Sequence, residues 1–495
     1  MNHGAGHSLG TRTLRGMLWA YGSYVGGRLL VLVSTAILAR LLDPADFGLV
    51  ALALVFTALL ESVSDLGVGQ ALVVVRGDDE HVLDRADTAF SFSLALGAGL
   101  TGLTAAIAPL AAAFFDQPQL TALLAVLGTN FLLRALGATH YALCQKRLDF
   151  RSRTVAEFAD VVIRGLTGIV LALAGAGAWS LVIGYIVGTA ALSATLWAMI
   201  PWRPKLRLRR AHVRELVGFG GTVSAISVIG AVIANVDYAF IGRVLGPALL
   251  GLYTLGFRLP DLIVVNLSIV AGQVLFPAFA AVEPAALGNA FLISLRYTLM
   301  VALPCSVLLV GLAEPLTLGA FGEQWRDSVA PMQVLTLYAL GVAIGIPAGS
   351  AYKATGRVGV LLKLAIPRGA MLVAAIALFV DRGIVAVAAC QAAVAALFAA
   401  IGIALATRLL EVGVPRVWSA AWPSLASAAA MLVVVLPVVA TVGSPWLALV
   451  IAGPPAGAAY LAALWLLDRE SVVRLRATAL ARRPAPAAAG EDPVV

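Results

Sequence analysis

The stretch ARLLDPADFGL, at Ala39–Leu49, recurs as GRVLGPALLGL at Gly242–Leu252. The two segments align without gaps and share arginine, leucine, proline, alanine, glycine and leucine at equivalent places. An internal repeat of this kind predicts that the chain contains two related lobes.

The composition places these lobes in a membrane. Hydrophobic residues make up 61% of the 495 residues and charged residues 12%, whereas a soluble domain carries about 25% charged residues. Apolar stretches of about 20 residues, long enough to cross hydrocarbon as helices, recur along the whole chain. The sequence therefore predicts an all-α polytopic membrane protein with about 14 transmembrane helices. We expect the first near Leu14–Leu42, the fifth near Thr154–Ala174, the seventh near Leu216–Ile241 and the last near Trp446–Leu467.

Lysine and arginine are unevenly distributed between the two sets of loops. If the N-terminus is cytoplasmic, the inner loops and termini collect 25 of these residues, and the outer loops collect only Arg40, Arg243, Arg326 and Arg382. Because positive residues in short loops stay inside, this bias predicts a multi-pass protein of the cytoplasmic membrane with both termini in the cytoplasm. The net charge of +8 reflects this orientation, and no nucleic-acid partner is expected. We interpret the basic run Arg203–Arg214 as a topology determinant that could also touch anionic membrane lipids.

The repeat sets the expected domain boundaries. Six spans per lobe is an even number, so the lobes should be parallel copies related by an axis along the membrane normal, with a substrate site between them. We expect an N-terminal lobe at residues 1–202, a basic cytoplasmic linker at 203–215, a C-terminal lobe at 216–410, two further helices at 411–468 and a cytoplasmic tail at 469–495 whose end is disordered. The second span of each lobe should begin on the outer face, at Pro44 with Gly48 and at Pro247 with Gly251.

Several segments resemble the polysaccharide transporter family. The likeness is clearest in NVDYAFIGRVLG (Asn235–Gly246) and in the segments that follow it, Leu250–Tyr253, Phe257–Pro260 and Val274–Phe279. The stretch LLDPADFG (Leu41–Gly48) and the tripeptide DLG (Asp65–Gly67) are similar to other recurring pieces of the family. Its members are the O-antigen and exopolysaccharide repeat-unit flippases of the multidrug/oligosaccharidyl-lipid/polysaccharide exporter superfamily. The likeness runs from Thr13 to Arg408 and is weak beyond.

This resemblance implies a function. It implies two helix bundles around a central cavity that opens alternately to either side of the membrane. It also implies undecaprenyl-diphosphate-linked oligosaccharides as the substrate, moved from the inner to the outer leaflet for cell-surface polysaccharide biosynthesis. Glycosyltransferases and a polysaccharide polymerase are then possible partners.

Five arginines lie within the predicted spans and are the candidate substrate-binding residues: Arg28, Arg134, Arg164, Arg258 and Arg368. A charge inside the membrane is costly and usually faces a cavity or a partner. A guanidinium carries a permanent charge and forked donors that fit phosphate oxygens. The alternative is internal pairing, with Asp160 for Arg164, with Asp261 for Arg258, and with Glu61 or Asp65 for Arg28 and Arg134.

Acidic residues in the spans are candidates for coupling to an ion. We favour Asp65 and Asp237, because neither has a basic residue within one helical turn, and keep Glu61 as a third candidate. Their carboxylates could bind a proton or Na⁺, or they could be counter-ions to the arginines.

Other functional classes lack their signatures in this sequence. There is no P-loop for nucleotide hydrolysis, and Cys144, Cys305 and Cys390 are too far apart for a metal-binding motif. No cofactor, metal site or catalytic residue is expected. The outer loops are too short for the separate catalytic site of a membrane-embedded polymerase, so we do not expect an enzyme. A multidrug antiporter or a peptidoglycan-precursor flippase of the same superfamily remains the alternative.

Overall fold

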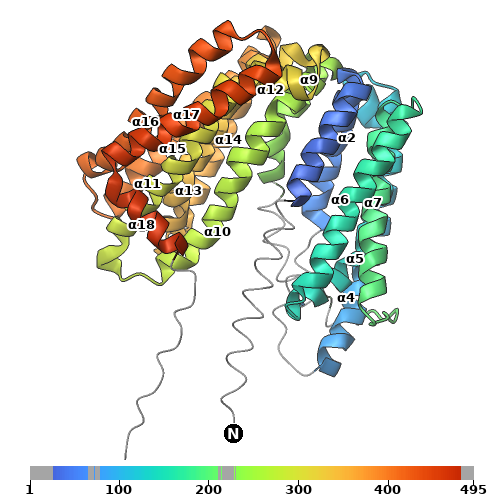
Figure 1. The fold of residues 1–495 in the computed structure, drawn as a ribbon. Helices are drawn as coiled ribbons and strands as arrows, with labels where there is room; N and C mark the ends of the chain where they lie inside the picture. The colour runs from blue at the N-terminus through green and yellow to red at the C-terminus, as the bar shows by residue number, and fades with distance from the viewer. Residues whose placement is uncertain are drawn as a thin grey trace, which may run out of the picture. The chain divides into compact units, whose positions relative to one another are not determined.

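The protein is helical wherever its structure is described. The computed structural model describes residues 26–64, 72, 79–209, 213, 228 and 230–480, and these contain helices and turns but no strand (Figure 1). This confirms the all-α class that the hydropathy pattern predicts. Within the chain, contacts define two compact units. The first takes the described chain up to Leu262 together with Thr317–Leu335 and Ala365–Val394. The second takes Ile263–Leu316, Thr336–Leu364 and the described chain from Ala395 onward.

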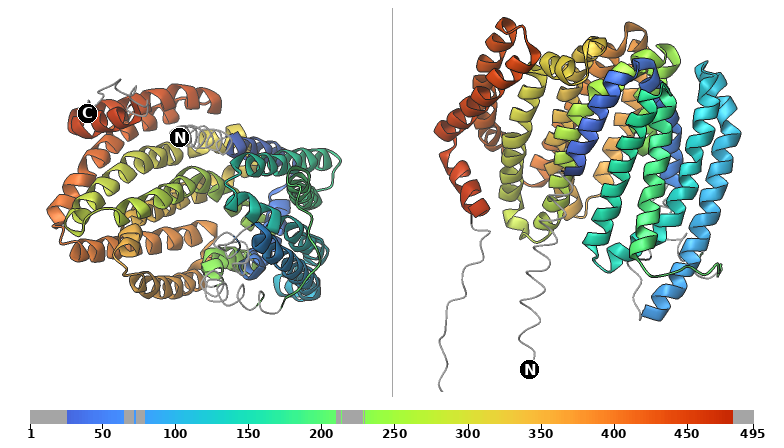
Figure 2. Two further views of the ribbon diagram at one scale, coloured as in Figure 1. Left: turned by 90° about the horizontal axis from the view of Figure 1, so that it is seen from below. Right: turned by 45° about the vertical axis from the view of Figure 1, so that its right-hand side comes forward.

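The first unit begins with a helix over residues 26–41 and contains another over residues 230–244. Its remaining long helices are α2 (Pro44–Ser64), α4 (Asp79–Phe115), α5 (Gln119–Lys146), α6 (Phe150–Leu173), α7 (Ala178–Met199) and α9 (Pro247–Pro260). Helices α4 and α5 pack together, as do α6 and α7, and α2 packs against α9. In both views of Figure 2 these blue to green helices run side by side. The unit also contains η3 (Glu323–Ser328), η4 (Val380–Arg382) and parts of α12 (Ala313–Ala320), α13 (Val329–Ala354), α14 (Gly359–Phe379) and α15 (Ile384–Leu409).

The second unit has its core where α11 meets the last two long helices. Its elements include most of η1 (Asp261–Val265), α10 (Asn266–Ala280), η2 (Pro284–Ala286), α11 (Leu287–Gly311), α16 (Val414–Thr441), α17 (Pro445–Leu467) and α18 (Arg469–Leu480). Phe291, Met431 and Val435 are buried in this core. The Tyr460 hydroxyl donates a hydrogen bond of 2.9 Å to the Met300 carbonyl oxygen, which satisfies a polar group that the core would otherwise leave unpaired.

Eleven helices in the described residues are long and apolar enough to cross a membrane. The predicted first and seventh spans extend beyond the described residues, where only 26–41 and 230–244 are seen as helix. The predicted fifth span is α6, a complete helix that carries Arg151, Arg153, Glu157, Asp160 and Arg164 and is therefore less apolar than the others. The polytopic architecture is thus confirmed, and the count of 14 stays a prediction.

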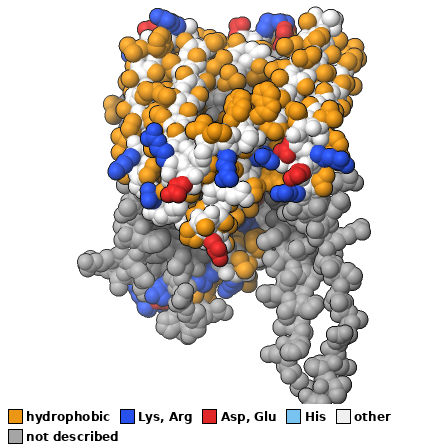
Figure 3. Space-filling model, turned by 90° about the vertical axis from the view of Figure 1, so that its left-hand side faces the viewer, with side chains coloured by type: hydrophobic (Ala, Val, Ile, Leu, Met, Phe, Trp, Pro, Cys, Tyr) orange, Lys and Arg blue, Asp and Glu red, His pale blue; other side chains and the backbone are white. Residues whose placement is uncertain are grey.

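The outer surface of the helices is apolar, as expected for a protein solvated by lipid. Val433 of α16 is 72% exposed, and Leu466 of α17 is 82% exposed. Figure 3 shows a broad hydrophobic band with charged side chains gathered above and below it. A contiguous apolar surface of this extent would cause aggregation in water but is stable in hydrocarbon.

The two copies of the repeat meet face to face within the first unit. Helix α2 begins at Pro44 and α9 begins at Pro247, each with proline in the first turn. A methyl group added to Gly48 would overlap the Pro247 carbonyl oxygen, and one added to Gly251 would overlap the Pro44 carbonyl oxygen. This reciprocal packing, which we call the glycine seam, confirms that the two segments begin equivalent helices at the same level. The wider division into lobes ending at residues 202 and 410 stays a prediction, as does the outer location of the seam.

Candidate functional site

The described candidate residues all belong to the first compact unit. They come from separate helical segments: Arg28 from 26–41, Glu61 from α2, Arg134 from α5, Arg164 from α6, Asp237 from 230–244, Arg258 from α9 and Arg368 from α14. Asp65 lies outside the described residues. The candidates are therefore brought to one unit from positions more than 300 residues apart in the chain.

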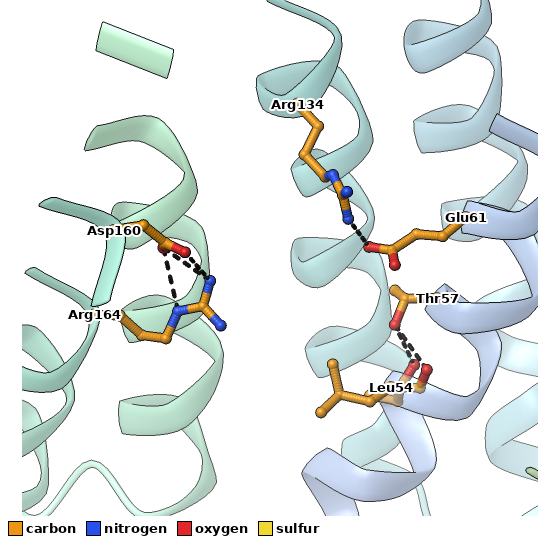
Figure 4. Close-up of polar contacts among 7 residues, drawn as sticks. Leu54, Thr57, Glu61, Arg134, Asp160 and Arg164 are labelled. Atoms are coloured by element: carbon orange, nitrogen blue, oxygen red, sulfur yellow. Dashed lines mark hydrogen bonds and ion pairs between the residues drawn. The ribbon is translucent and has the colours of Figure 1, made fainter. Parts of the chain in front are cut away.

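Arg134 forms an ion pair with Glu61, which reaches it from a different helix. The Arg134 Nη1 atom lies 2.6 Å from the Glu61 Oε1 atom (Figure 4). The Arg134 side chain is 54% exposed and that of Glu61 is 28% exposed. One turn before Glu61, the Thr57 hydroxyl donates a hydrogen bond to the Leu54 carbonyl oxygen of its own helix. Of the two partners considered from sequence, Glu61 pairs with Arg134, and Asp65 lies outside the described residues.

Arg164 is held by Asp160 one turn earlier on α6, as their spacing predicts. Two bonds of 2.8 Å join Arg164 Nη2 to both carboxylate oxygens of Asp160. The guanidinium lies over the ring of Tyr185, 4.2 Å from its centroid, a favourable cation–π contact. Helix α7 can approach this pair because Gly188 has no side chain, and a methyl group there would overlap Asp160. Small residues at helix contacts commonly allow such close packing in membranes.

Tyr185 lies near both ion pairs and was missed by the sequence analysis. This half-buried side chain interacts electrostatically with Glu61 and Arg134 as well as with Asp160 and Arg164. The two pairs therefore share one neighbourhood between α2, α5, α6 and α7. The spacing of Gly184 and Gly188 around Tyr185 was the only signal in the sequence that marked this part of α7 as a close helix contact.

Arg258 adds a further cation beside this neighbourhood. Asp261 attracts it most strongly, in agreement with the predicted pairing, and Tyr238 also interacts with it. Arg28 and Arg164 both lie near enough to repel Arg258 electrostatically. Arg258 thus lies near two other cations inside a membrane protein, an arrangement that an anionic ligand would stabilise.

Arg368 differs from the other four arginines. Its Nε atom is buried without a hydrogen-bond partner, and it forms no ion pair in the part of the chain that the structure describes. It follows Pro367 in α14, where the next residue, Gly369, packs against Ile233. A buried donor without an acceptor is costly, so this guanidinium is suited to a ligand that supplies one.

Asp237 is buried among neutral groups. The Tyr253 hydroxyl donates a hydrogen bond of 2.7 Å to its Oδ2 atom. The Gln391 side chain also approaches the carboxylate, although Oδ1 has no hydrogen bond of normal geometry. No arginine or lysine of the described residues forms an ion pair with it. Nor do the described residues contain a cluster of three His, Cys, Asp or Glu side chains that could hold a metal ion.

Comparison with known proteins assigns the chain to a family. The family model described as "Polysaccharide biosynthesis protein" matches residues 37–330, which is more than half of the chain. The protein belongs to this polysaccharide biosynthesis family. The lipopolysaccharide biosynthesis protein WzxC of Escherichia coli is 27% identical over 72% of this chain and 73% of its own length. The succinoglycan biosynthesis transport protein ExoT of Rhizobium meliloti is 29% identical over 67% of each chain. The teichuronic acid biosynthesis protein TuaB of Bacillus subtilis is 24% identical over 71% of this chain and 73% of its own length.

Solved structures share the fold of this family member. A lipid II flippase, MurJ, in an inward closed conformation has a TM-score of 0.72 at 13% identity and covers 92% of this chain and 100% of its own. An inward-facing multidrug resistance transporter of the MATE family has a TM-score of 0.60 at 16% identity, over 78% of this chain and 94% of its own. The predicted polytopic helical fold is therefore confirmed.

The candidate site of this polysaccharide biosynthesis protein contains several arginines, two of them with counter-ions from its own helices. Among the described candidates, Arg134 and Arg164 are paired with carboxylates, Arg258 is close to other cations, and Arg368 has an unsatisfied donor. Such a set can bind a multiply charged anion through forked hydrogen bonds. No nucleophile or general base is needed for that task.

Proposed function

We propose that this protein is a flippase that moves undecaprenyl-diphosphate-linked oligosaccharide repeat units from the inner to the outer leaflet of the cytoplasmic membrane. It works by alternating access and serves cell-surface polysaccharide biosynthesis. The observation that carries the proposal is the gathering of membrane arginines in one unit of a chain that belongs to the polysaccharide biosynthesis family. The protein transports its substrate and does not convert it.

The names of the relatives support a shared lipid-diphosphate end as the recognised group. The relatives are named for three different products, lipopolysaccharide, teichuronic acid and succinoglycan. A site common to proteins of all three pathways would therefore bind the part of the substrate that does not vary. A diphosphate has the charge and the oxygen geometry that guanidinium forks prefer.

The arginines contribute to diphosphate binding in different ways in this proposal. Arg368 contacts the diphosphate directly, because its buried donor lacks an acceptor in the described residues. Arg28 and Arg258 supply positive potential beside Arg164. Arg134 is reached after its bond to Glu61 opens. A multidrug site for organic cations would instead favour acids and aromatics, and the cationic neighbourhood argues against that alternative.

Ion coupling is assigned to Asp237 first. A carboxyl group held by Tyr253 and Gln391, without a permanent cation, can exchange a proton or a Na⁺ ion at a smaller cost than one in an ion pair. Glu61 becomes a weaker candidate for this role because Arg134 neutralises it. Asp65 stays a candidate on its sequence position alone.

The orientation and partners follow from the loop charges. Both termini lie in the cytoplasm, where the basic linker can meet anionic lipids. In the described part of this linker, the Lys205 N–H donates to Asp87 of α4, and Arg209 forms an ion pair with Asp84 at 2.8 Å. Leu206, between them, is 76% exposed. Glycosyltransferases that build the repeat unit and a polymerase that uses it are the proposed functional partners.

The proposal is tested by deleting the gene. Cells without the protein should lose a surface polysaccharide and accumulate its lipid-linked repeat unit on the cytoplasmic side, where a membrane-impermeant glycan probe cannot reach it. Wild-type protein and the Arg382→Ala variant, altered in an outer loop away from the site, should both restore export. If deletion leaves every surface glycan unchanged and no lipid-linked intermediate accumulates, the proposal is wrong.

A further inference from the structure

Two of the membrane arginines are neutralised by carboxylates, but the two ion pairs are built differently. Asp160 binds Arg164 through both carboxylate oxygens, within one helix, and Tyr185 covers the guanidinium. Gly188 of α7 packs directly against Asp160, so this carboxylate is fixed in place. The Asp160–Arg164 pair is therefore a permanent part of the scaffold.

The Glu61–Arg134 pair is instead built across two helices. One bond of 2.6 Å, from Nη1 to Oε1, joins side chains of two helices, α5 and α2. The Arg134 side chain is more exposed than that of Arg164, at 54% against 36%. A pair of two long, partly exposed side chains is easily exchanged, because its net stability is small.

We propose that Glu61 is a built-in competitor of the substrate, an exchangeable counter-ion that the diphosphate displaces from Arg134 and that returns when the diphosphate leaves. This inference rests on the proposed function and names the residue that sets the affinity of its site. While Glu61 holds Arg134, the neighbourhood of Tyr185 contains two carboxylates and two guanidinium groups. A diphosphate that binds Arg134 meets repulsion from Glu61 unless this carboxylate swings away.

Displacement of Glu61 from Arg134 gives the site an intermediate affinity for the diphosphate. A substrate that must enter on one side and leave on the other has to be bound firmly enough to enter and weakly enough to leave. Breaking the Glu61–Arg134 bond subtracts from the affinity for the diphosphate. Re-forming it on the outer side favours release.

The test measures binding of farnesyl diphosphate, a short soluble prenyl diphosphate, to the purified full-length protein in detergent. Removing a partly exposed counter-charge changes a binding free energy modestly, so Glu61→Gln should lower Kd about 3- to 10-fold. Export in cells should fall at the same time, because release becomes slower. Arg134→Ala should weaken binding, and Glu61→Gln should bring no gain in the Arg134→Ala background, since a double-mutant cycle isolates this pair.

Matched controls separate the possible outcomes. Glu157→Gln removes a comparable carboxylate that is paired with Arg153 at 2.8 Å, and it should leave Kd unchanged. Glu61→Met repeats the test with an uncharged side chain of similar length if the glutamine variant is unstable. If wild-type protein and all variants fail to bind farnesyl diphosphate, the diphosphate substrate itself is wrong. If wild type binds but loss of the Glu61 charge leaves Kd unchanged or raises it, only the competitor role is overturned.

Discussion

Replacing Gly48 by alanine tests the glycine seam between the two copies of the repeat. The new methyl group would overlap the backbone carbonyl of Pro247, which cannot turn away as a side chain could. Helices α2 and α9 must therefore move apart, and overpacking of this kind costs about 1–3 kcal/mol. Gly251→Ala should cost a similar amount, because its methyl group would overlap the Pro44 carbonyl.

The two substitutions should not be additive. Once α2 and α9 have separated to accommodate one methyl group, the second meets less resistance, so the double variant should lose less stability than the sum of the single variants. Thermal denaturation of the purified protein in one detergent measures all three. Gly99→Ala is the matched control, because nothing lies within 4 Å of the methyl group it adds to helix α4. It should be neutral or stabilising by up to about 1 kcal/mol. Wild-type stability of Gly48→Ala, or strict additivity, would refute the reciprocal packing.

Three further predictions concern the site and the orientation. Arg368→Ala should abolish or strongly reduce export of the lipid-linked glycan at a normal protein level. Arg368→Lys should rescue export only partly, because lysine keeps the charge but loses the forked donors of the guanidinium. Normal export by the alanine variant would exclude a role of Arg368 in diphosphate binding. Asp237→Asn should keep the protein folded, since an amide can still accept from Tyr253, but should remove any dependence of transport rate on a proton or Na⁺ gradient, measured in proteoliposomes. A reporter enzyme active only in the cytoplasm should work when fused after Arg210 and fail after Gly246, and the opposite pattern would reverse the proposed topology.

The fold could be predicted from sequence because lipid imposes strong local rules. Long apolar runs must become helices, since hydrocarbon offers no partner for an exposed backbone. The Asp160–Arg164 pair was equally accessible, because residues four apart share one helix face. Helix α6, whose charges reduce its apolar character, lies where the fifth span was predicted, and its crossing of the membrane stays a prediction.

The rest of the site depends on which helices meet, and a single sequence does not report that. Glu61 and Arg134 are 73 residues apart, so no helical spacing links them, and Arg134 lacks a carboxylate only within its own turn. Tyr185 was missed for the same reason, since the four charged residues near it lie on other helices. The missing hydrogen-bond acceptor for the Arg368 Nε atom likewise cannot be predicted without knowing which helices surround it.

The glycine seam also bears on the history of the chain. Because Gly48 fits against Pro247 and Gly251 against Pro44, a larger residue in either copy is penalised by a backbone atom of the other. After a duplication, neither glycine could be replaced freely by a larger residue, whereas most lipid-facing positions could exchange one apolar residue for another. The contact thus accounts for the glycine that the eleven-residue segments beginning at Ala39 and Gly242 share at equivalent places.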